Sequence, residues 1–130
     1  MAYNEIFLVG RIIAGFMFIM FGLNHFMKLE MLSGYAGSKG VPAPKLAVIG
    51  SGLLLLIGGI SFLIGFQPLI GTIALALFFI GVTPMMHNFW KVEDEQMKMA
   101  EMTHFMKNMT ILGLVLMILF TVDIEWPFAI

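Results

Sequence analysis

The stretch Leu46 to Phe66 reads LAVIGSGLLLLIGGISFLIGF and contains no charged side chain. A helix needs roughly 20 mainly apolar residues to cross the hydrocarbon core of a bilayer, and this stretch meets that requirement. Three further stretches of similar length and character lie around it, at about 6–27, 69–89 and 104–122. The sequence therefore predicts four transmembrane helices.

The composition of the whole chain agrees with a place in the membrane. Apolar residues make up 60% of the chain and charged residues 12%, which is about half the charge of an ordinary soluble domain. An apolar exterior is costly in water, whereas lipid requires it. The length allows one domain, and no linker divides the chain. We therefore expect residues 1–130 to form a single all-α domain, a transmembrane four-helix bundle surrounded by the lipid bilayer.

Several classes of function are excluded by what the sequence lacks. A formal charge of -1 without a basic block leaves no footprint for nucleic acid. Cysteine is absent, which excludes disulfides and thiolate-held zinc or iron–sulfur centres. No nucleophile elbow, P-loop or dinucleotide fingerprint is present. Neither a metal site nor a covalently bound cofactor is predicted.

The connections between the spans differ in character. Residues 28–45 are polar and contain glycines and prolines, which predicts a loop with at most a short interfacial turn. Gln67-Pro68 predicts a tight hairpin between the second and third spans. Residues 90–103 collect charges, and Asp94 precedes Lys98 by four, which favours the start of a helix whose methionines would lie on the membrane surface. Trp126, in the tail, is interpreted as an interface anchor.

The lysines predict the orientation of the bundle. The first and third connections share one side of the membrane and contain Lys28, Lys39, Lys45, Lys91 and Lys98. The opposite side has no lysine, and Arg11 lies inside the first span. By the positive-inside rule these two connections are cytoplasmic and both termini are outside.

One face of the first span gathers small and polar residues. At 100° per residue a single stripe about 80° wide contains Arg11, Gly15, Phe18, Gly22 and His25. Glycines let membrane helices approach closely, and the second and third spans carry similar glycine rows. The stripes are interpreted as packing seams, with the alternative that one seam opens into a cleft for a lipid-soluble ligand.

Arg11 is the least expected residue of the four spans. A charge inside a span costs on the order of 2–3 kcal/mol on insertion scales, so it should face protein and find a partner. Glu5, Asp123 and Glu125 lie on the same side of the bilayer. Two interpretations are open: an ion pair that stabilises the bundle, or a cation that holds the head group of an anionic or quinone-like ligand.

Polar residues also cluster at the opposite membrane face. His25, His87 and His104 lie at span ends there, and neighbours at similar depth are Asn24, Asn88, Lys107 and Asn108. Imidazole can shuttle protons, bind a quinone carbonyl or ligate metal, and the spacing does not decide among these roles. Capping of helix ends is the alternative. The ligand-binding candidates are therefore Arg11, His25, His87, Lys107 and Asn108, and no catalytic residue is indicated.

A set of spaced motifs runs through the chain. The motifs are Arg11-x3-Gly15-x6-Gly22-x2-His25, Gly40-x-Pro42, Gly58-Gly59-x5-Gly65, His87-x-Phe89-Trp90 and Phe105-x-Lys107-Asn108-x3-Leu112-Gly113. From about Arg11 to Leu119 the chain resembles the DoxX family of small four-helix membrane proteins. Many members carry a glutamate in the second span before the paired glycines. Here that stretch is Leu53–Leu56, so no role of that carboxylate carries over.

The resemblance implies a bacterial-type inner (plasma) membrane protein. Members are associated with quinone-linked respiratory chemistry, including the small membrane subunits of thiosulfate:quinone oxidoreductase, and with oxidative-stress membrane complexes. It therefore favours an accessory subunit that contacts other membrane subunits and contributes part of a quinone pocket.

Two alternatives to an accessory subunit remain. One is a stand-alone quinone-binding membrane oxidoreductase that uses the ligand-binding candidates. The other is a small carrier for a lipophilic or metal solute, which would need charges along the depth of the bundle. The second and third spans offer almost none.

Overall fold

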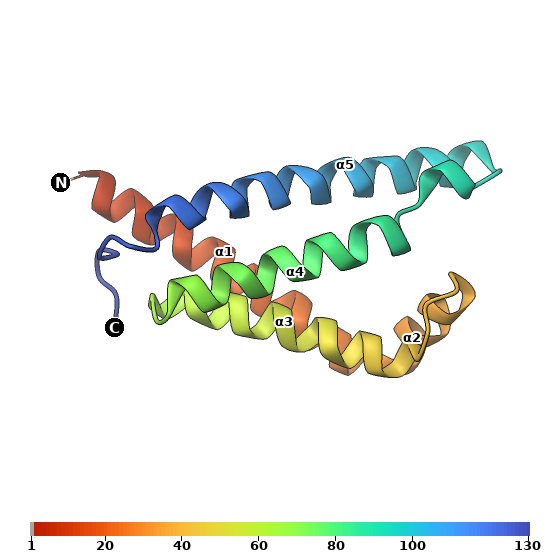
Figure 1. The fold of residues 1–130 in the computed structure, drawn as a ribbon, viewed down its shortest axis with the longest axis horizontal. Coiled ribbons are helices and arrows are strands. Elements are labelled where there is room, and N and C mark those ends of the chain that lie inside the picture. The colour runs from red at the N-terminus through yellow and green to blue at the C-terminus, as the bar shows by residue number, and fades with distance from the viewer. Residues whose placement is uncertain (1) are drawn as a thin grey trace.

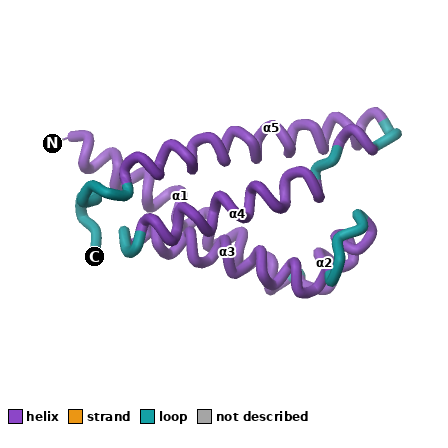
Figure 2. The backbone as a smooth tube through the Cα atoms, in the orientation of Figure 1, coloured by secondary structure: helices purple, strands orange, loops and turns teal. Residues whose placement is uncertain are grey.

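Five α-helices and two short 3-10 helices make up most of the described chain, residues 2–130, in the computed structural model (Figures 1 and 2). In chain order they are α1 (Ala2–Met27), α2 (Leu29–Ser38), α3 (Pro44–Ile64), α4 (Pro68–Met86), η1 (Phe89–Lys91), α5 (Glu95–Ile118) and η2 (Leu119–Thr121). Four of them, α1, α3, α4 and α5, are long and apolar enough to cross a membrane. Residues 2–130 contain no strand. The prediction of an all-α transmembrane four-helix bundle is confirmed.

The two ends of the bundle carry different connections. Figure 1 shows both termini and the α3–α4 hairpin at one end, and α2 with the α4–α5 connection at the other. Helix α3 packs on α1 and on α4, and α5 packs on the α4 side of the bundle. The first and third connections thus lie on the same side of the bundle.

Glycines bring α1 and α3 into backbone contact. A Cβ atom added to Gly15 would lie 2.8 Å from the carbonyl oxygen of Gly59, and one added to Gly59 would lie 2.9 Å from that of Gly15. A Cβ atom on Gly22 would lie 3.0 Å from the carbonyl oxygen of Gly52. The interpretation of the glycine stripe as a packing seam is confirmed for this pair of helices.

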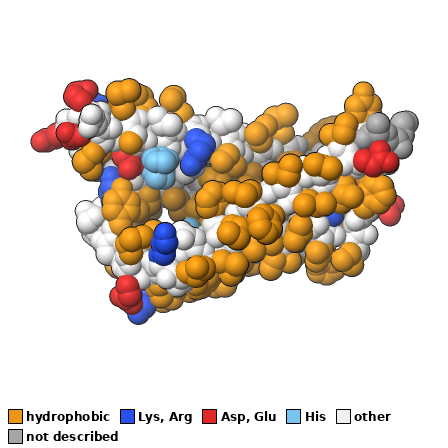
Figure 3. Space-filling model, turned by 180° about the vertical axis from the view of Figure 1, so that it is seen from behind, with side chains coloured by type: hydrophobic (Ala, Val, Ile, Leu, Met, Phe, Trp, Pro, Cys, Tyr) orange, Lys and Arg blue, Asp and Glu red, His pale blue; other side chains and the backbone are white. Residues whose placement is uncertain are grey.

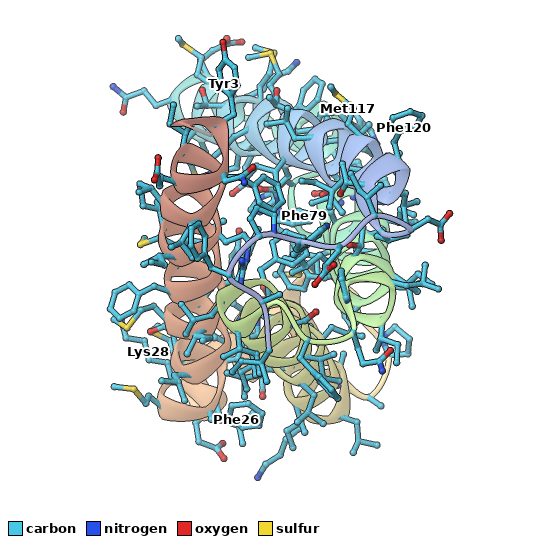
Figure 4. All side chains as sticks on the ribbon, turned by 90° about the vertical axis from the view of Figure 1, so that its left-hand side faces the viewer. Tyr3, Phe26, Lys28, Phe79, Met117 and Phe120 are labelled. Atoms are coloured by element: carbon cyan, nitrogen blue, oxygen red, sulfur yellow. The ribbon has the colours of Figure 1, made fainter. Side chains whose placement is uncertain are left out.

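Aromatic and aliphatic side chains fill the centre of the bundle. Figure 4, which looks along the bundle, shows Phe79 in the middle and Met117 and Phe120 on the outside. The ring of Phe18 meets those of Phe62 and Phe79 edge to face, at centroid distances of 6.4 and 6.1 Å. Hydrophobic side chains also cover most of the outer surface in Figure 3, and charged ones gather towards the ends. This distribution is what a lipid-facing bundle requires.

The first connection contains a helix that was not predicted from the sequence. Residues 29–38 form α2 although two glycines lie within it. A glycine inside a helix costs only about 1 kcal/mol, and α2 packs against α3 with Ala36 buried. The prolines lie after α2, where Pro44 opens α3 at a position that favours proline. The prediction of a loop with a short turn is wrong here.

The fourth long helix begins earlier than the span predicted from His104. Asp94 caps it, because its Oδ2 atom accepts a hydrogen bond from the Met97 backbone N–H at 2.9 Å. From Glu95 to Leu112 the chain contains neither glycine nor proline. Nothing therefore interrupts the helix, and the predicted surface-lying segment is instead the first part of α5.

Candidate functional site

A cavity of about 530 Å³ lies at the end of the bundle opposite the termini. Its walls come from α1 to α5 and are mainly apolar, with side chains that include Leu54, Leu55, Phe78, Val82 and Ile111. Figure 3 shows a hollow at this end of the molecule, with histidine and basic side chains at its rim. The cavity therefore combines apolar walls with polar side chains at its rim.

Four of the five predicted ligand-binding residues line this cavity. His25 enters from the last turn of α1, His87 follows α4, and Lys107 and Asn108 come from α5. The ring of His25 lies edge to face with that of Phe78, at 6.0 Å between centroids. Arg11 lies at the other end of the bundle. The structure thus places the polar cluster around one space and separates Arg11 from it.

A hydrogen-bond network ties α2, the end of α4 and α5 together beside the cavity. His87 Nδ1 lies 2.8 Å from Glu101 Oε2, and the Tyr35 hydroxyl donates to Glu101 Oε1 at 3.2 Å. The Glu101 side chain is only 14% exposed and that of His87 21%. The His104 ring lies beside that of His87, with centroids 5.1 Å apart. This carboxylate therefore orients both a cavity-lining imidazole and a tyrosine.

A second contact closes the same end. Lys39 Nζ donates to Asn88 Oδ1 at 3.1 Å and lies 5.7 Å from the centre of the Tyr35 ring.

Partial burial, followed by the charge and hydrogen bond of Glu101, raises the pKa of Tyr35. The hydroxyl group therefore stays protonated, and remains a donor, throughout the neutral range.

Three residues of this end, Tyr35, Lys39 and Glu101, were not predicted from the sequence as residues of the site. The first two belong to the connection interpreted as a loop, and Glu101 to the segment interpreted as surface-lying. A signal for Glu101 was available in its spacing. Glu101, Phe105, Asn108, Leu112 and Val115 repeat at four and three residues, which places them on one helix face. All of them are buried or half-buried.

Arg11 is buried at the opposite end and donates to backbone oxygens. Its Nε atom donates to the carbonyl oxygen of Phe62 at 2.9 Å, and its two terminal nitrogens donate to those of Leu63 and Pro127. No carboxylate pairs with Arg11 within residues 2–130, so the interpretation as an ion pair is wrong, and the interpretation as a ligand-holding cation stays untested. Since the carbonyls of the last helical turn lack partners within the helix, the end of α3 supplies acceptors without burying a second charge.

Trp126 is covered by protein instead of lying at the membrane interface. Its ring meets those of Phe7 and Phe62 edge to face at 5.2 and 5.5 Å, and its Nε1 atom donates to the Thr121 carbonyl oxygen at 3.1 Å. Arg11 lies 5.7 Å from the ring centre. The tail folds back over the bundle and buries the indole, so its interpretation as an interface anchor is wrong.

The candidate site offers donors and an imidazole and lacks a cluster of metal ligands. Within residues 2–130 no group of three or more His, Cys, Asp or Glu side chains is arranged to hold a metal ion.

The family model described as DoxX matches residues 6–88, which is most of the chain. The chain belongs to the DoxX family. With its four apolar helices it is a multi-pass integral membrane protein of that family.

One curated relative supports the assignment to the DoxX family. The chain is 28% identical to "Inner membrane protein YphA" of Escherichia coli (strain K12) over 116 residues, which cover 88% of this chain and 81% of the relative. No solved structure matches. The DoxX match includes His25 and His87 and ends before Glu101 and Lys107.

Proposed function

We propose that this DoxX-family protein binds the ring of a quinone in the cavity and acts as an accessory subunit of a quinone-linked or respiratory membrane complex. The observation that carries the proposal is the cavity itself, which combines apolar walls with polar side chains at one end. Its volume of about 530 Å³ falls within the range of roughly 300–1,000 Å³ that is typical of small-molecule sites.

The side chains around the cavity suit a flat apolar ring that carries oxygens. Phe78 and the aliphatic residues offer contact surface for the ring and for a tail that continues into lipid. The ammonium group of Lys107 and the side-chain amide of Asn108 are donors that suit the ring oxygens. His25 and His87 add imidazole groups at the same end.

The accessory role is supported by the lack of sequence motifs for a redox centre in this chain. The sequence has no cysteine to hold an iron–sulfur centre, and no fingerprint for a dinucleotide. A partner subunit would therefore supply or accept the electrons, while this chain contributes helices and the quinone pocket. Helix α5 packs mainly on α4, which leaves much of its surface for lipid or for another subunit.

Replacing Lys107 or Asn108 by alanine is expected to weaken quinone binding about tenfold or more, since a hydrogen bond to a polar or charged group contributes about 1–2 kcal/mol. The measurement is titration of the purified protein in detergent with decylubiquinone. Lys91→Ala, which removes an exposed lysine outside the cavity, is the matched control. Unchanged affinity in both cavity variants, with the fold intact, would refute quinone binding at this site.

We also propose that both termini lie outside the cytoplasm and that the cavity lies at the cytoplasmic end. Because the chain has no cysteine, single cysteines can be labelled without background. In intact cells a membrane-impermeant maleimide is expected to label Asp123→Cys, whereas Ser38→Cys should react only after lysis. The reverse pattern of labelling would overturn the orientation.

A further inference from the structure

We infer that the cavity selects the reduced, hydroxyl-bearing form of its ligand, a quinol, because His87 presents a bare ring nitrogen to it. The inference rests on the proposed function and adds the redox state of the ligand. It follows from the position of Glu101 relative to the cavity.

The two edges of the His87 ring face different surroundings. His87 lines the cavity, whereas Glu101 does not. Nδ1 is the ring nitrogen that meets the carboxylate, at 2.8 Å. The opposite edge of the ring, which carries Nε2, is therefore the edge available to a ligand.

The carboxylate decides where the imidazole carries its proton. An ionised carboxylate only accepts hydrogen bonds, so a neutral His87 must carry its proton on Nδ1 and donate it to Glu101. Nε2 is then a lone-pair acceptor. Glu101 is kept as an acceptor by the Tyr35 hydroxyl, which donates to its other oxygen at 3.2 Å.

The other polar groups at this end do not reverse that assignment. The His104 ring lies beside the His87 ring. Lys39, which directly follows α2, donates its ammonium hydrogen to Asn88 Oδ1. Lys107 and Asn108 approach the cavity from α5. Within residues 2–130, Glu101 is the only hydrogen-bond partner of the His87 ring.

An acceptor in the wall distinguishes the two redox forms of the ligand. A quinol hydroxyl donates to Nε2, whereas a quinone offers only carbonyl oxygens, which would face a lone pair. A site built to pair with a hydroxyl disfavours the analogue that lacks it, because its own polar group is left unpaired. Lys107 donates to oxygen lone pairs that both forms possess, so it contributes little to the choice.

The test compares decylubiquinol with decylubiquinone on the wild-type protein and on Glu101→Gln. The wild type is expected to bind the quinol about tenfold more tightly. A glutamine can donate its amide N–H to Nδ1, which moves the ring proton to Nε2. In Glu101→Gln the ratio should therefore fall to about one or invert. Glu95→Gln, an exposed position on the same helix, should keep the wild-type ratio.

The outcomes separate this inference from the function on which it rests. A wild type that binds both forms equally, or prefers the quinone, overturns the selection of quinol, and this arm stands even where the Glu101 variant does not fold. An unchanged ratio in folded Glu101→Gln overturns the role of the carboxylate. Binding of neither form by the wild type would instead refute the proposed quinone site.

Discussion

Replacement of Gly15 by leucine is expected to prevent α1 from packing on α3 and to leave little folded protein in the membrane. A Cβ atom at this position would lie 2.7 Å from the Leu63 backbone nitrogen and 2.8 Å from the Gly59 carbonyl oxygen. Both atoms belong to backbone, which cannot move aside as the end of a side chain can. Overpacking of this kind costs roughly 1–3 kcal/mol and more where the backbone must shift. Tight packing is also the main force between membrane helices.

The control for this prediction lies on the same helix. No atom outside the local helix lies within 4 Å of a Cβ atom at Gly10, so Gly10→Leu adds the same side chain facing lipid. Thermal unfolding in detergent, followed by size-exclusion chromatography, measures both variants. Gly10→Leu should stay within a few degrees of the wild type, whereas Gly15→Leu should aggregate. Equal melting temperatures for the two variants would contradict the close contact between α1 and α3.

Replacement of Arg11 by methionine is expected to release the carboxyl-terminal tail from the bundle. The guanidinium joins the end of α3 to the tail through the carbonyl oxygens of Phe62, Leu63 and Pro127. Hydrogen bonds to a charged group contribute about 1.5–3 kcal/mol each, and the saved cost of placing a charge in the span offsets part of their loss. The net loss of stability should be on the order of 2–4 kcal/mol.

Acrylamide quenching of Trp126 fluorescence, recorded in a Trp90→Phe background, measures the release of the tail, because Trp126 is buried in the folded protein. In Arg11→Met acrylamide should quench this fluorescence strongly, while Arg11→Lys, which keeps the charge without the planar fork, should be quenched to an intermediate degree. Asp123→Asn and Glu125→Gln should behave as the wild type. Destabilisation by these two carboxylate variants comparable to that of Arg11→Met would restore the ion-pair interpretation.

The sequence predicts the helix faces well because their signals are periodic. Gly15 and Gly22 share a stripe with Phe18, and all three face the bundle interior. The partner of Arg11 was not predictable in the same way. Its acceptors are backbone carbonyls, which every residue carries, and they become available only where α3 ends and the tail returns.

The candidate site was predicted in part for a related reason. Residues at span ends on the same side must lie at similar depth, and this placed His25, His87 and Lys107 at one end of the bundle. Glu101 and Tyr35 were missed because they belong to segments whose helices depend on tertiary packing. The two glycines of α2 weaken its local signal, and contact with α3 outweighs them.

We propose that this DoxX-family protein supplies a quinone pocket to a larger membrane complex. The most direct measurement is purification of the tagged protein from its own membranes in mild detergent, with proteins identified by mass spectrometry and extracted lipids assayed for quinone. We expect recovery in fixed ratio with respiratory or other quinone-linked subunits and with bound quinone, and loss of the quinone in Lys107→Ala. Recovery of the chain alone and free of quinone would contradict the proposal.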